Sequence, residues 1–425
     1  MKFSAVSVAL AAVSLIGITS PAVAQDASRR SQVIVPKSSI ERPEDRGIRA
    51  HTNLLILQPA MGNQPLSSIR PLVGPPAAGY FYETPASIGC LYKLTKAVKG
   101  CNPNTVTANP TGGFGAIAIV DAYDDPDAAT DLATFSTQFG LPAPTSKTFS
   151  VVYATGKKPI QDSTGGWELE ESLDIEWAHA MAPNAEIILV EAASDSFSDL
   201  LTAESKAAAL VNAAGGGEVS NSWGGSEFSG ETANDSTFVE SGVVFFASAG
   251  DSAGTIYPSV SPNVVSAGGT TISRNPVTGA FQAELAWNSA GGGPSSLESR
   301  PSYQDGVESV VGSSRGSPDL SFDSDPNTGV WVADSIPVNG QGGPGAWWVV
   351  GGTSVASPSL AGIVNATGLK ETSSEAELTE IYSKIGTVDF ADTIKGSCYF
   401  YDGYLAVKGW DFCTGVGSVK GKLGK

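Results

Sequence analysis

The sequence predicts an α/β fold in which helices cover both faces of a mostly parallel sheet. From Gly115 onward, short runs rich in valine, isoleucine and phenylalanine alternate with stretches of helical periodicity. This is the order expected of parallel strands joined by crossover helices. The chain has 425 residues, 41% of them hydrophobic, with 49 glycines and 26 prolines. It can therefore bury a large core and still contain many loops.

The expected elements follow the chain in order. Strands are predicted at Ala116 to Tyr123, Val151 to Ala154, Glu186 to Ala192, Glu218 to Ser222, Val243 to Ser248 and Val264 to Ala267. Helices are predicted near Asp127 to Phe139, Trp167 to Met181, Phe197 to Ala213 and Ser357 to Thr367. The stretch from Asn275 to Gly345 is rich in Gly, Ser, Pro and Asp, and is expected to be long surface loop with one hairpin at most.

The N-terminus has the features of an export signal. Residues 1–24 combine Lys2, an apolar run from Val6 to Ile18 and the small residues Ala22-Val23-Ala24, which predicts a signal peptide. We therefore expect a secreted protein, extracellular or periplasmic. Residues 25–82 are mixed and proline-punctuated, and we interpret them as an N-terminal extension or short pro-segment before a domain spanning residues 83–425.

Charge and cysteine content narrow the possible partners. Acidic residues outnumber basic ones by 43 to 25, giving a net charge of −18, so nucleic acid and membrane surfaces are expected not to be partners. We expect a monomer. The four cysteines of an exported chain favour disulfides, and sequence proximity pairs Cys90 with Cys101 and Cys398 with Cys413. A zinc site is the weaker alternative, because neither histidine has ligand spacing to a cysteine.

The run from Gly351 to Pro358 predicts a hydroxyl at the start of a helix. Two glycines permit a sharp turn, and proline is best tolerated in a first helical turn, so a helix should begin near Ser354. A serine there would lie among free N–H groups at the positive helix end. The alternative is that Ser357 caps a helix whose first residue is Pro358, and this stretch alone does not separate the two.

The helix predicted at Trp167 to Met181 places two acids on its apolar side. At 100° per residue, Glu170 and Asp174 fall within the arc formed by the leucines and tryptophans. Two inward carboxylates four residues apart would repel and lose hydration, so they are expected to share a proton, as acid–base groups do. The opposite side, with Glu168, Ser172, Glu176 and His179, is expected to be solvated.

A third acid follows the strand that ends at Ser248. Ligands gather at the carboxyl ends of strands in open α/β sheets, so Asp251, between glycines, could face a cleft. The ordinary interpretation is an aspartate in a turn. A Ser/His/Asp triad would have to use His51 or His179. A subtilisin-type protease using Asp121, His179 and Ser354 is therefore kept as an alternative.

Together these stretches resemble the sedolisin family, the serine-carboxyl peptidases. The matching motifs are Glu170 to Ala178 with Ala182-Pro183, Ser220-Asn221-Ser222-Trp223-Gly224, Ser248 to Ser252, Tyr257-Pro258 to Gly268-Gly269-Thr270, Gly352 to Pro358, and Gly409-Trp410-Asp411 with Thr414-Gly415. The resemblance covers the chain from about Glu83 onward and implies a subtilisin-like α/β fold.

The resemblance implies an activity and a role for each site residue. Ser354 would be the nucleophile, Glu170 the general base and then acid, Asp174 its proton-sharing partner and Asp251 the oxyanion-hole acid. The substrates would be polypeptides, cut by an acid-active endopeptidase. A tripeptidyl exopeptidase of the same family, or a catalytically silent secreted binding protein on this fold, are the alternatives.

The resemblance also implies one structural calcium ion near the C-terminus. The similar positions are Asp392 and Asp411 for side chains and Thr393, Val407 and Gly409 for carbonyls. Hard oxygen ligands of this kind suit calcium.

Overall fold

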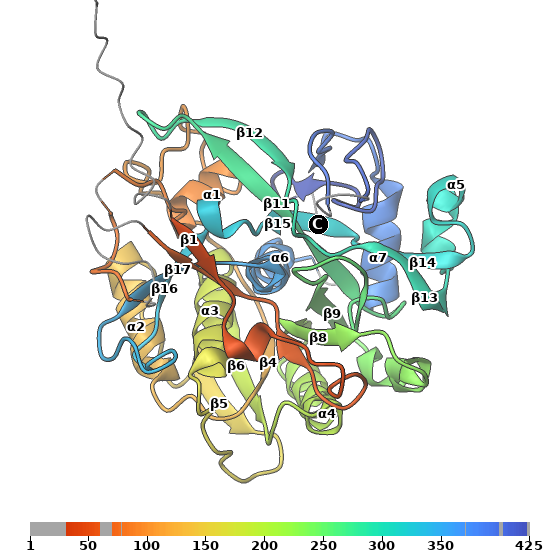
Figure 1. Cartoon of the computed structure of the whole chain (residues 1–425), viewed down its shortest axis with the longest axis horizontal. Coiled ribbons are helices and arrows are strands. Elements are labelled where there is room, and N and C mark those ends of the chain that lie inside the picture. The colour runs from red at the N-terminus through yellow and green to blue at the C-terminus, as the bar shows by residue number, and fades with distance from the viewer. Residues whose placement is uncertain (1–30, 60–69, 78, 370, 399–402, 423–425) are drawn as a thin grey trace, which may run out of the picture.

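A ten-stranded sheet forms the centre of the molecule. The structure, a computed structural model, describes residues 31–59, 70–77, 79–369, 371–398 and 403–422. The predicted signal peptide lies outside the described residues. The strand order is β18-β19-β15-β11-β9-β7-β4-β6-β5, with β12 added beside β11. Apart from the antiparallel pairs β11–β12 and β18–β19, these strands are parallel. The predicted mostly parallel α/β fold is therefore confirmed (Figure 1).

Of the ten strands of this sheet, six lie close to their predicted positions, and four (β12, β15, β18 and β19) lie where no strand was predicted. Their bounds are β4 Ala116–Ala122, β5 Phe149–Tyr153, β6 Glu186–Ala192, β7 Gly217–Asn221, β9 Val243–Ser248, β11 Val265–Arg274, β12 Phe281–Ala286, β15 Leu320–Asp323, β18 Phe390–Ala391 and β19 Ser418–Val419. Along β4 the side chains alternate between the two faces of the sheet: Ile117 and Ile119 join one core cluster, and Ala118 and Val120 join the other. Both faces of β4 are thus buried, as the continuous apolar run predicts.

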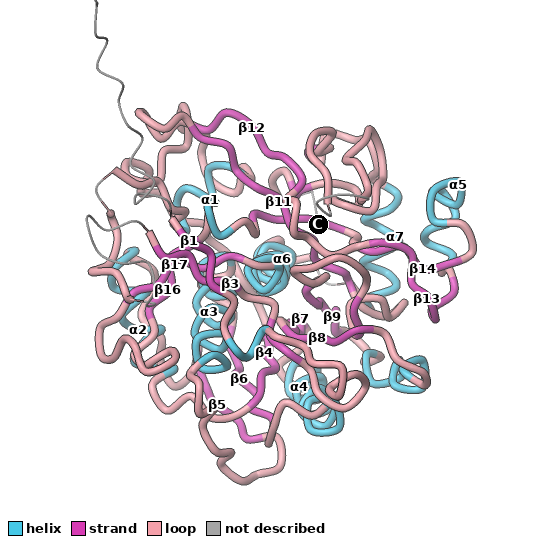
Figure 2. The backbone as a smooth tube through the Cα atoms, viewed as in Figure 1, coloured by secondary structure: helices cyan, strands magenta, loops and turns pink. Residues whose placement is uncertain are grey.

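Helices cover both faces of the sheet. On one side lie α1 (Pro85–Leu91), α2 (Ala128–Phe139), α3 (Gly166–Met181), α6 (Thr353–Ala366) and α7 (Ser374–Ser383), which contribute to one core cluster. On the other side α4 (Phe197–Ala213) contributes to the second cluster. Figure 2 shows α6 near the centre of the view, with α3 beside it. The helices α3 and α6, which carry the predicted acids and serine, therefore pack on the same face.

The prediction that Asn275 to Gly345 is mostly surface loop is wrong. This stretch contains β12, β13 (Gly293–Ser299), β14 (Ser314–Ser317), β15, β16 (Val330–Ala333) and the short helix α5 (Glu308–Val311). Strand β14 has the sequence Ser-Arg-Gly-Ser and no apolar alternation. Arg315 is nevertheless fully buried, because its guanidinium pairs with Asp319 at 2.5 Å. A buried ion pair formed by the tertiary structure leaves no hydrophobic period in the sequence.

The N-terminal stretch adds strands to the body of the molecule. Strand β1 (Gln32–Ile34) pairs with β3 (Leu55–Gln58), which pairs with β17 (Trp347–Gly351), and β17 pairs with β16. Strand β2 (His51–Thr52) pairs with β8 (Trp223–Ser226), whose other neighbour is β10 (Ile256–Tyr257). In Figure 1 this segment, coloured red to orange, runs across the front of the molecule over α3 and α6.

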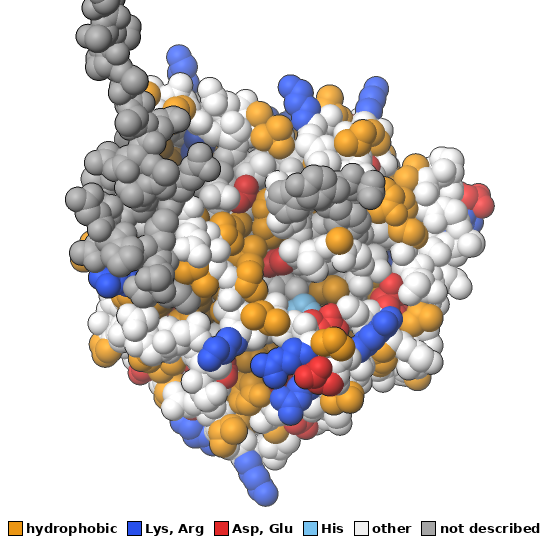
Figure 3. Space-filling model, viewed as in Figure 1, with side chains coloured by type: hydrophobic (Ala, Val, Ile, Leu, Met, Phe, Trp, Pro, Cys, Tyr) orange, Lys and Arg blue, Asp and Glu red, His pale blue; other side chains and the backbone are white. Residues whose placement is uncertain are grey.

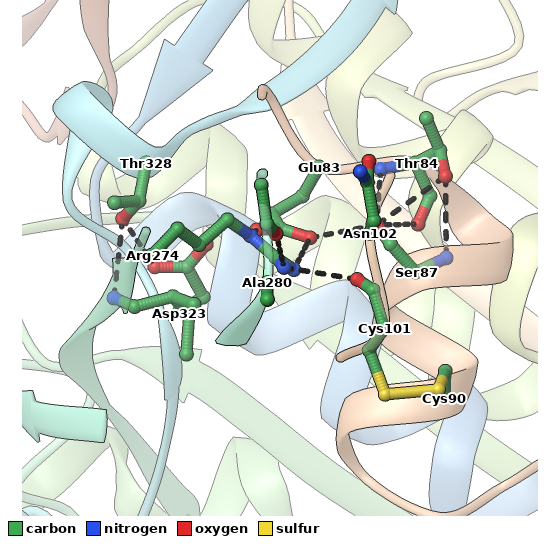
Figure 4. A network of polar contacts seen from close by, with 12 residues as sticks. Glu83, Thr84, Ser87, Cys90, Cys101, Asn102, Arg274, Ala280, Asp323 and Thr328 are labelled. Atoms are coloured by element: carbon green, nitrogen blue, oxygen red, sulfur yellow. Dashed lines mark hydrogen bonds and ion pairs between the residues drawn. A yellow bond between two sulfur atoms is a disulfide. The ribbon is translucent and has the colours of Figure 1, made fainter. Parts of the chain in front are cut away.

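A network of polar contacts fixes the start of α1 (Figure 4). Thr84 and Ser87 form a capping box, in which each side chain accepts a hydrogen bond from the other residue's N–H. The Arg274 guanidinium of β11 forms a bidentate ion pair with Glu83, at 2.5 and 2.7 Å. It also donates to the Cys101 carbonyl at 2.9 Å. The pair thus joins the first helix to the central sheet.

Both predicted disulfides are present. Cys90 bonds to Cys101 and Cys398 to Cys413, with Cα atoms 5.5 and 5.3 Å apart.

Of the helices that the structure describes, none has the length and apolar character needed to cross a bilayer. On the face shown in Figure 3, basic and acidic side chains gather below the centre of the view.

Candidate active site

Helix α3 is buried on every side. All of its 16 residues are buried, so the prediction that Glu168, Ser172, Glu176 and His179 face solvent is wrong. The loop before the helix and a strand distant in sequence cover that side and supply hydrogen bonds. Asp162 N–H donates to Glu168 at 2.7 Å, and Ala333 N–H donates to Glu176 at 3.1 Å. A helix wheel cannot anticipate this, because it shows one helix without the strands and loops that pack on it.

Glu170 and Asp174 point into the interior, as the wheel predicts. Both are 0% exposed. The Ser222 hydroxyl donates to Asp174 Oδ1 at 2.8 Å. Burial raises the pKa of Glu170 well above its usual range, Asp174 and Asp121 raise it further, and the nearby Ser354 hydroxyl acts in the opposite direction. The pKa of Asp174 is likewise raised by burial, while the hydrogen bond from Ser222 and the nearby Glu170 carboxyl act to lower it.

The pair therefore favours a protonated form. Neither Glu170 oxygen, nor Asp174 Oδ2, has a hydrogen-bond partner among the described residues by distance and angle. Two such oxygens on neighbouring carboxyls can share a proton, which removes the repulsion between them. The structure thus places two buried carboxyls that can share a proton near Ser354, which is also 0% exposed.

Ser354 is the second residue of α6. Its hydroxyl lies 3.2 Å from the Ser222 carbonyl oxygen, to which it donates, and its N–H donates to the Asn53 carbonyl at 3.0 Å. The helix begins at Thr353, as predicted to within one residue. The alternative that Ser357 caps a helix starting at Pro358 is wrong. Ser357 lies inside α6, with its hydroxyl 2.8 Å from that of Ser220.

Asp251 follows the carboxyl end of β9 and approaches the start of α6. Its Oδ1 accepts hydrogen bonds from the Thr353 N–H at 2.7 Å and from the Thr353 hydroxyl at 3.0 Å. Its Oδ2 is buried, with no partner among the described residues. Burial raises the pKa of Asp251 to about 7, while the two bonds from Thr353 and the charge of His51 act to lower it.

Gly352 lies against the Asn53 carbonyl and the Asp251 side chain. It has a φ of +107°, which L-residues rarely adopt. A Cβ atom at this position would collide with the Asn53 carbonyl oxygen and with Asp251 Oδ2. Those two oxygens therefore lie on the same side of Gly352. A proton on Asp251 would remove the repulsion between them and could be donated to the carbonyl.

The two histidines take other positions. His179 Nε2 lies 2.9 Å from the Pro142 carbonyl oxygen, and burial lowers the pKa of the ring. His51 lies in β2, with Nε2 3.7 Å from a Glu41 oxygen. Asp121 is fully buried, and burial followed by Asp174 and Glu191 raises its pKa well above the usual range. The subtilisin-type alternative needs the His179 ring beside Ser354. The ring instead contacts the Pro142 carbonyl, so the structure does not favour that alternative.

Three residues at the site had no role assigned from the sequence. Ser222 bonds to Asp174, Ser248 bonds to the Asn53 side chain at 2.7 Å, and Asn53 contacts Ser354 from the N-terminal segment. Ser222 and Ser248 lie within the motifs quoted above, at the ends of the adjacent strands β7 and β9. That position, at the carboxyl edge of the sheet, is the signal that could have indicated them.

The predicted calcium ligands share one C-terminal loop. Gly409 N–H donates to Asp392 Oδ2, and Val407 N–H donates to Asp411 Oδ2, both at 2.9 Å. Asp392 Oδ1 is buried, with no partner among the described residues. Within the described part of the chain, no three His, Cys, Asp or Glu side chains are grouped closely enough to hold a metal. The two carboxylates fit a hard cation only if carbonyl oxygens supply the other ligands.

Comparisons with known proteins identify relatives of this chain. No family model matches it. Kumamolisin from Bacillus sp. (strain MN-32) is 32% identical over 342 residues, which are 72% of this chain and 58% of that protein. Sedolisin from Pseudomonas sp. (strain 101) is 33% identical over 177 residues, which are 38% of this chain and 28% of that protein. The chain thus spans less than two thirds of the length of the curated relatives it matches.

A solved structure agrees with these matches. It is Pseudomonas sedolisin, described as a serine-carboxyl proteinase complexed with two molecules of pseudo-iodotyrostatin, with a TM-score of 0.63 and 25% identity. The match covers 80% of this chain and 96% of that one. The subtilisin-like α/β fold implied by the resemblance is confirmed. Its motifs, its fold and its relatives together place this chain in the sedolisin family.

Proposed function

We propose that this protein is a secreted, acid-active serine-carboxyl endopeptidase. The observation that carries the proposal is the convergence of Ser354 with two groups of buried acids, Glu170–Asp174 and Asp251, whose pKa values are all raised. Buried carboxyls are costly to a fold, and such groups cluster at sites of acid–base chemistry. Membership of the sedolisin family supports the same assignment.

Glu170 acts first as a general base. A serine hydroxyl is a weak nucleophile until a neighbouring group removes its proton. The Ser354 hydroxyl turns from the Ser222 carbonyl toward Glu170 and gives up its proton as the oxygen attacks the substrate carbonyl carbon. Asp174, which shares a proton with Glu170, keeps the pair at a single negative charge and so makes Glu170 basic enough for the transfer.

Asp251 and the Ser354 N–H stabilise the oxyanion of the tetrahedral intermediate. A protonated carboxyl is a hydrogen-bond donor, whereas a carboxylate only accepts. The Ser354 N–H lies in the first turn of α6, where it has no partner within the helix and donates to the Asn53 carbonyl, and the helix dipole favours negative charge there. Donors aimed at the developing charge in a buried site are the largest single source of catalysis in acyl transfer.

The second half of the reaction reverses these roles. Glu170 returns its proton to the leaving amine, and the peptide C–N bond breaks to leave an ester on Ser354 Oγ. A water molecule then attacks the ester carbonyl and gives a proton to Glu170. That proton passes to Ser354 Oγ as the ester bond breaks, which releases the new carboxyl group and restores the enzyme.

Endopeptidase action is supported by the path of the N-terminal segment. The chain continues past Ser354 in both directions, paired with β8 before Asn53 and with β17 after Leu54. The site therefore accommodates a polypeptide that extends on both sides of the nucleophile. A tripeptidyl exopeptidase would need a barrier after the third residue on the N-terminal side.

We further propose that one calcium ion holds the C-terminal loop. Asp392 and Asp411 would supply carboxylate oxygens, and Thr393, Val407 and Gly409 carbonyl oxygens. The buried free oxygen of Asp392 supports this assignment. Bound there, the ion would stabilise the loop that the Cys398–Cys413 disulfide also closes. The two disulfides in turn support export to an oxidising compartment.

Casein hydrolysis tests the proposed function. The wild-type protein should degrade casein at about pH 4, where unperturbed carboxyls are half protonated, and Ser354→Ala should not. Digestion of one peptide with free ends and of the same peptide with blocked ends separates the two modes of cleavage. Equal cleavage of both peptides supports an endopeptidase. Casein degradation by Ser354→Ala at the wild-type rate would overturn the proposal.

A further inference from the structure

The loop that carries Asp251 is held at both ends and exposed between them. Before Asp251, the Gly250 carbonyl accepts the Gly291 N–H at 2.7 Å. After it, the Gly254 carbonyl accepts the Gly292 N–H at 2.9 Å. The three residues that directly follow Asp251 are exposed. An exposed loop keeps one conformation only where its ends are fixed, so the contacts at its far end decide how firmly Asp251 is placed.

Thr255 fixes that far end to β8. It lies one residue before β10, where Ile256 pairs with Ser226 in antiparallel register, so Thr255 lies opposite Glu227. The Thr255 hydroxyl donates to Glu227 Oε2 at 2.5 Å. Strand β10 has only two residues, and so short a strand is marginal without side-chain contacts. The bond between Thr255 and Glu227 therefore continues the pairing that holds the loop.

Glu227 is itself fixed by β13. Its Oε1 accepts hydrogen bonds from the Ser295 hydroxyl and from the Ser296 N–H, the latter at 3.1 Å. Its Oε2 also accepts from the Ser296 N–H at 3.1 Å and from the Ser296 hydroxyl at 3.3 Å. The residue is 5% exposed. A buried polar group with all of these partners is rigid, so Glu227 can serve as a fixed point for Thr255.

The position of the loop affects the oxyanion groups directly. The two hydrogen bonds from Thr353 hold Asp251 Oδ1, and the buried Oδ2 is the oxygen left to carry a donated proton. Its direction depends on the backbone beneath it, which the loop supplies. A displacement of about 1 Å in a catalytic group can lower a rate about 10²-fold. A contact that fixes this loop therefore affects catalysis without touching the substrate.

We propose that Thr255 and Glu227 are positioning residues, which hold the loop so that Asp251 can donate to the oxyanion. The inference rests on the proposed function. Both residues act through Asp251 rather than on the reacting atoms. Because an oxyanion donor binds the transition state more strongly than the substrate, loosening the loop should lower kcat and leave KM nearly unchanged.

Thr255→Val tests this inference, because valine keeps the shape of threonine and donates no hydrogen bond. Thr255 is half-buried, so the variant is expected to fold, and its Tm checks this. On a peptide substrate at about pH 4, loss of one hydrogen bond predicts about a tenfold lower kcat, with KM within about twofold of the wild type. Thr255→Ser keeps the hydroxyl and should stay within about twofold of the wild type in both constants.

An Asp251→Ala background separates positioning from general damage. If Thr255 acts through Asp251, adding Thr255→Val to Asp251→Ala should lower kcat by less than about twofold, because the group being positioned is already absent. A loss of about tenfold in both backgrounds would show that Thr255 supports the fold in general, and would overturn the inference.

The pH profile gives a second readout. Burial raises the pKa of Asp251 to about 7, while the bonds from Thr353 and the charge of His51 act to lower it. A loosened loop admits water to this carboxyl and weakens the effect of burial. The alkaline limb of Thr255→Val should therefore lie at lower pH than that of the wild type. A limb that stays in place would contradict the loosening of the loop.

Thr271→Val is the matched control. Thr271 is also half-buried, and its hydroxyl donates to a carboxylate oxygen of Asp325 at 2.8 Å. This variant should keep kcat within about twofold of the wild type and leave the alkaline limb in place. Equal effects of Thr271→Val and Thr255→Val would show that neither change acts specifically on Asp251, and the inference would fail.

Glu227→Leu tests the other partner. Burial raises the pKa of Glu231 to about 8 and of Glu298 to about 7, and the charge of Glu227 contributes to both rises. Leucine therefore changes these neighbours as well as the bond to Thr255, so the variant is compared with Glu227→Leu/Thr255→Val. The second change should lower kcat by less than about twofold, since its partner is gone. A further loss of about tenfold would exclude the link between the two residues.

The outcomes separate the inference from the function on which it rests. Peptide cleavage that depends on Ser354 but is unaffected by Thr255→Val overturns the inference and leaves the proposed function standing. A wild-type protein without cleavage that depends on Ser354 overturns both.

Discussion

The backbone N–H of Ser354 donates a hydrogen bond of 3.0 Å to the carbonyl oxygen of Asn53, a residue 301 positions earlier in the chain. One end of this bond is the first turn of α6, which carries the proposed nucleophile. The other is a peptide bond in an extended strand. The contact therefore joins the start of α6 to a segment that pairs by backbone hydrogen bonds with β8 on one side and with β17 on the other.

The first prediction concerns activity at high pH. Asp251 has a pKa of about 7 and donates only while protonated, so kcat/KM should fall as pH rises through about 7. Asp251→Asn keeps a donor at every pH and should move the alkaline limb upward, whereas Asp251→Ala should lower kcat about 10²- to 10³-fold. Initial rates on one peptide across the pH range measure both. An unchanged alkaline limb in Asp251→Asn would contradict the assignment.

The second prediction compares two buried acids of α3. Glu170→Gln removes the base beside Ser354 and should lower kcat at least about 10³-fold. Glu171→Gln is the matched control, because Glu171 is equally buried on the same helix but its pKa is affected by Asp125 and Glu191 rather than by Ser354. It should stay within about tenfold of the wild type. Equal losses in both variants would point to general damage of the helix.

The third prediction concerns stability against pH. Burial raises the pKa of Asp125 to about 7 and of Glu168 and Glu204 to about 8, from ordinary values of 3.8 and 4.5. Between about pH 4 and pH 8 the folded chain keeps protons that the unfolded chain loses, so stability falls as pH rises through this window. Tm by calorimetry should be highest in mild acid.

Glu204→Gln tests the origin of that slope. Glu204 is fully buried, and the Asn221 side chain donates to it at 3.3 Å. An uncharged amide in its place removes one titrating group, so the fall of Tm between pH 5 and pH 8 should become shallower. A steeper fall in this variant would exclude the explanation.

The fourth prediction compares two glycines with positive φ. Gly352→Ala combines backbone strain at +107° with collisions against Asn53 and Asp251, and should lower kcat at least about 10²-fold. Gly340, at +77°, has open space around its Cα. Gly340→Ala should cost about 1 kcal/mol of stability and leave kcat unchanged. Peptidase rates and Tm of both variants separate strain from the steric effect at the site.

The fifth prediction concerns calcium and uses a structural readout. If the ion holds the C-terminal loop, excess EDTA should lower the Tm and added calcium should restore it, since a ligand that binds only the folded state stabilises it. Asp392→Asn should lose most of this response. Asp389→Asn, a change at a nearby half-buried acid, serves as the control. A Tm that ignores both EDTA and calcium would exclude the ion.

The sequence by itself determined six of the ten strands of the central sheet and pointed to Glu170, Asp174, Asp251 and Ser354 as candidate site residues. Strands such as β6 and β9 and the helix α4 were predicted to the residue. Each is an apolar or amphipathic run whose hydrophobic pattern lies wholly within the segment and does not depend on its neighbours in the fold. The inward direction of Glu170 and Asp174 also followed from helical geometry alone. Apolar residues that recur about every 3.6 positions indicate a helix, and those that recur every 2 positions indicate a strand, whatever the rest of the chain does.

Tertiary structure alone decided what surrounds those side chains. The polar side of α3 is buried partly because Ala333 and Pro142 bring backbone N–H and carbonyl groups to Glu176 and His179, and no period within the helix records their approach. In the same way, Asn53 reaches Ser354 only after β2 and β3 pair with strands from distant parts of the chain. Hydrogen bonds between remote segments depend on the folded path, so they leave no local pattern to predict.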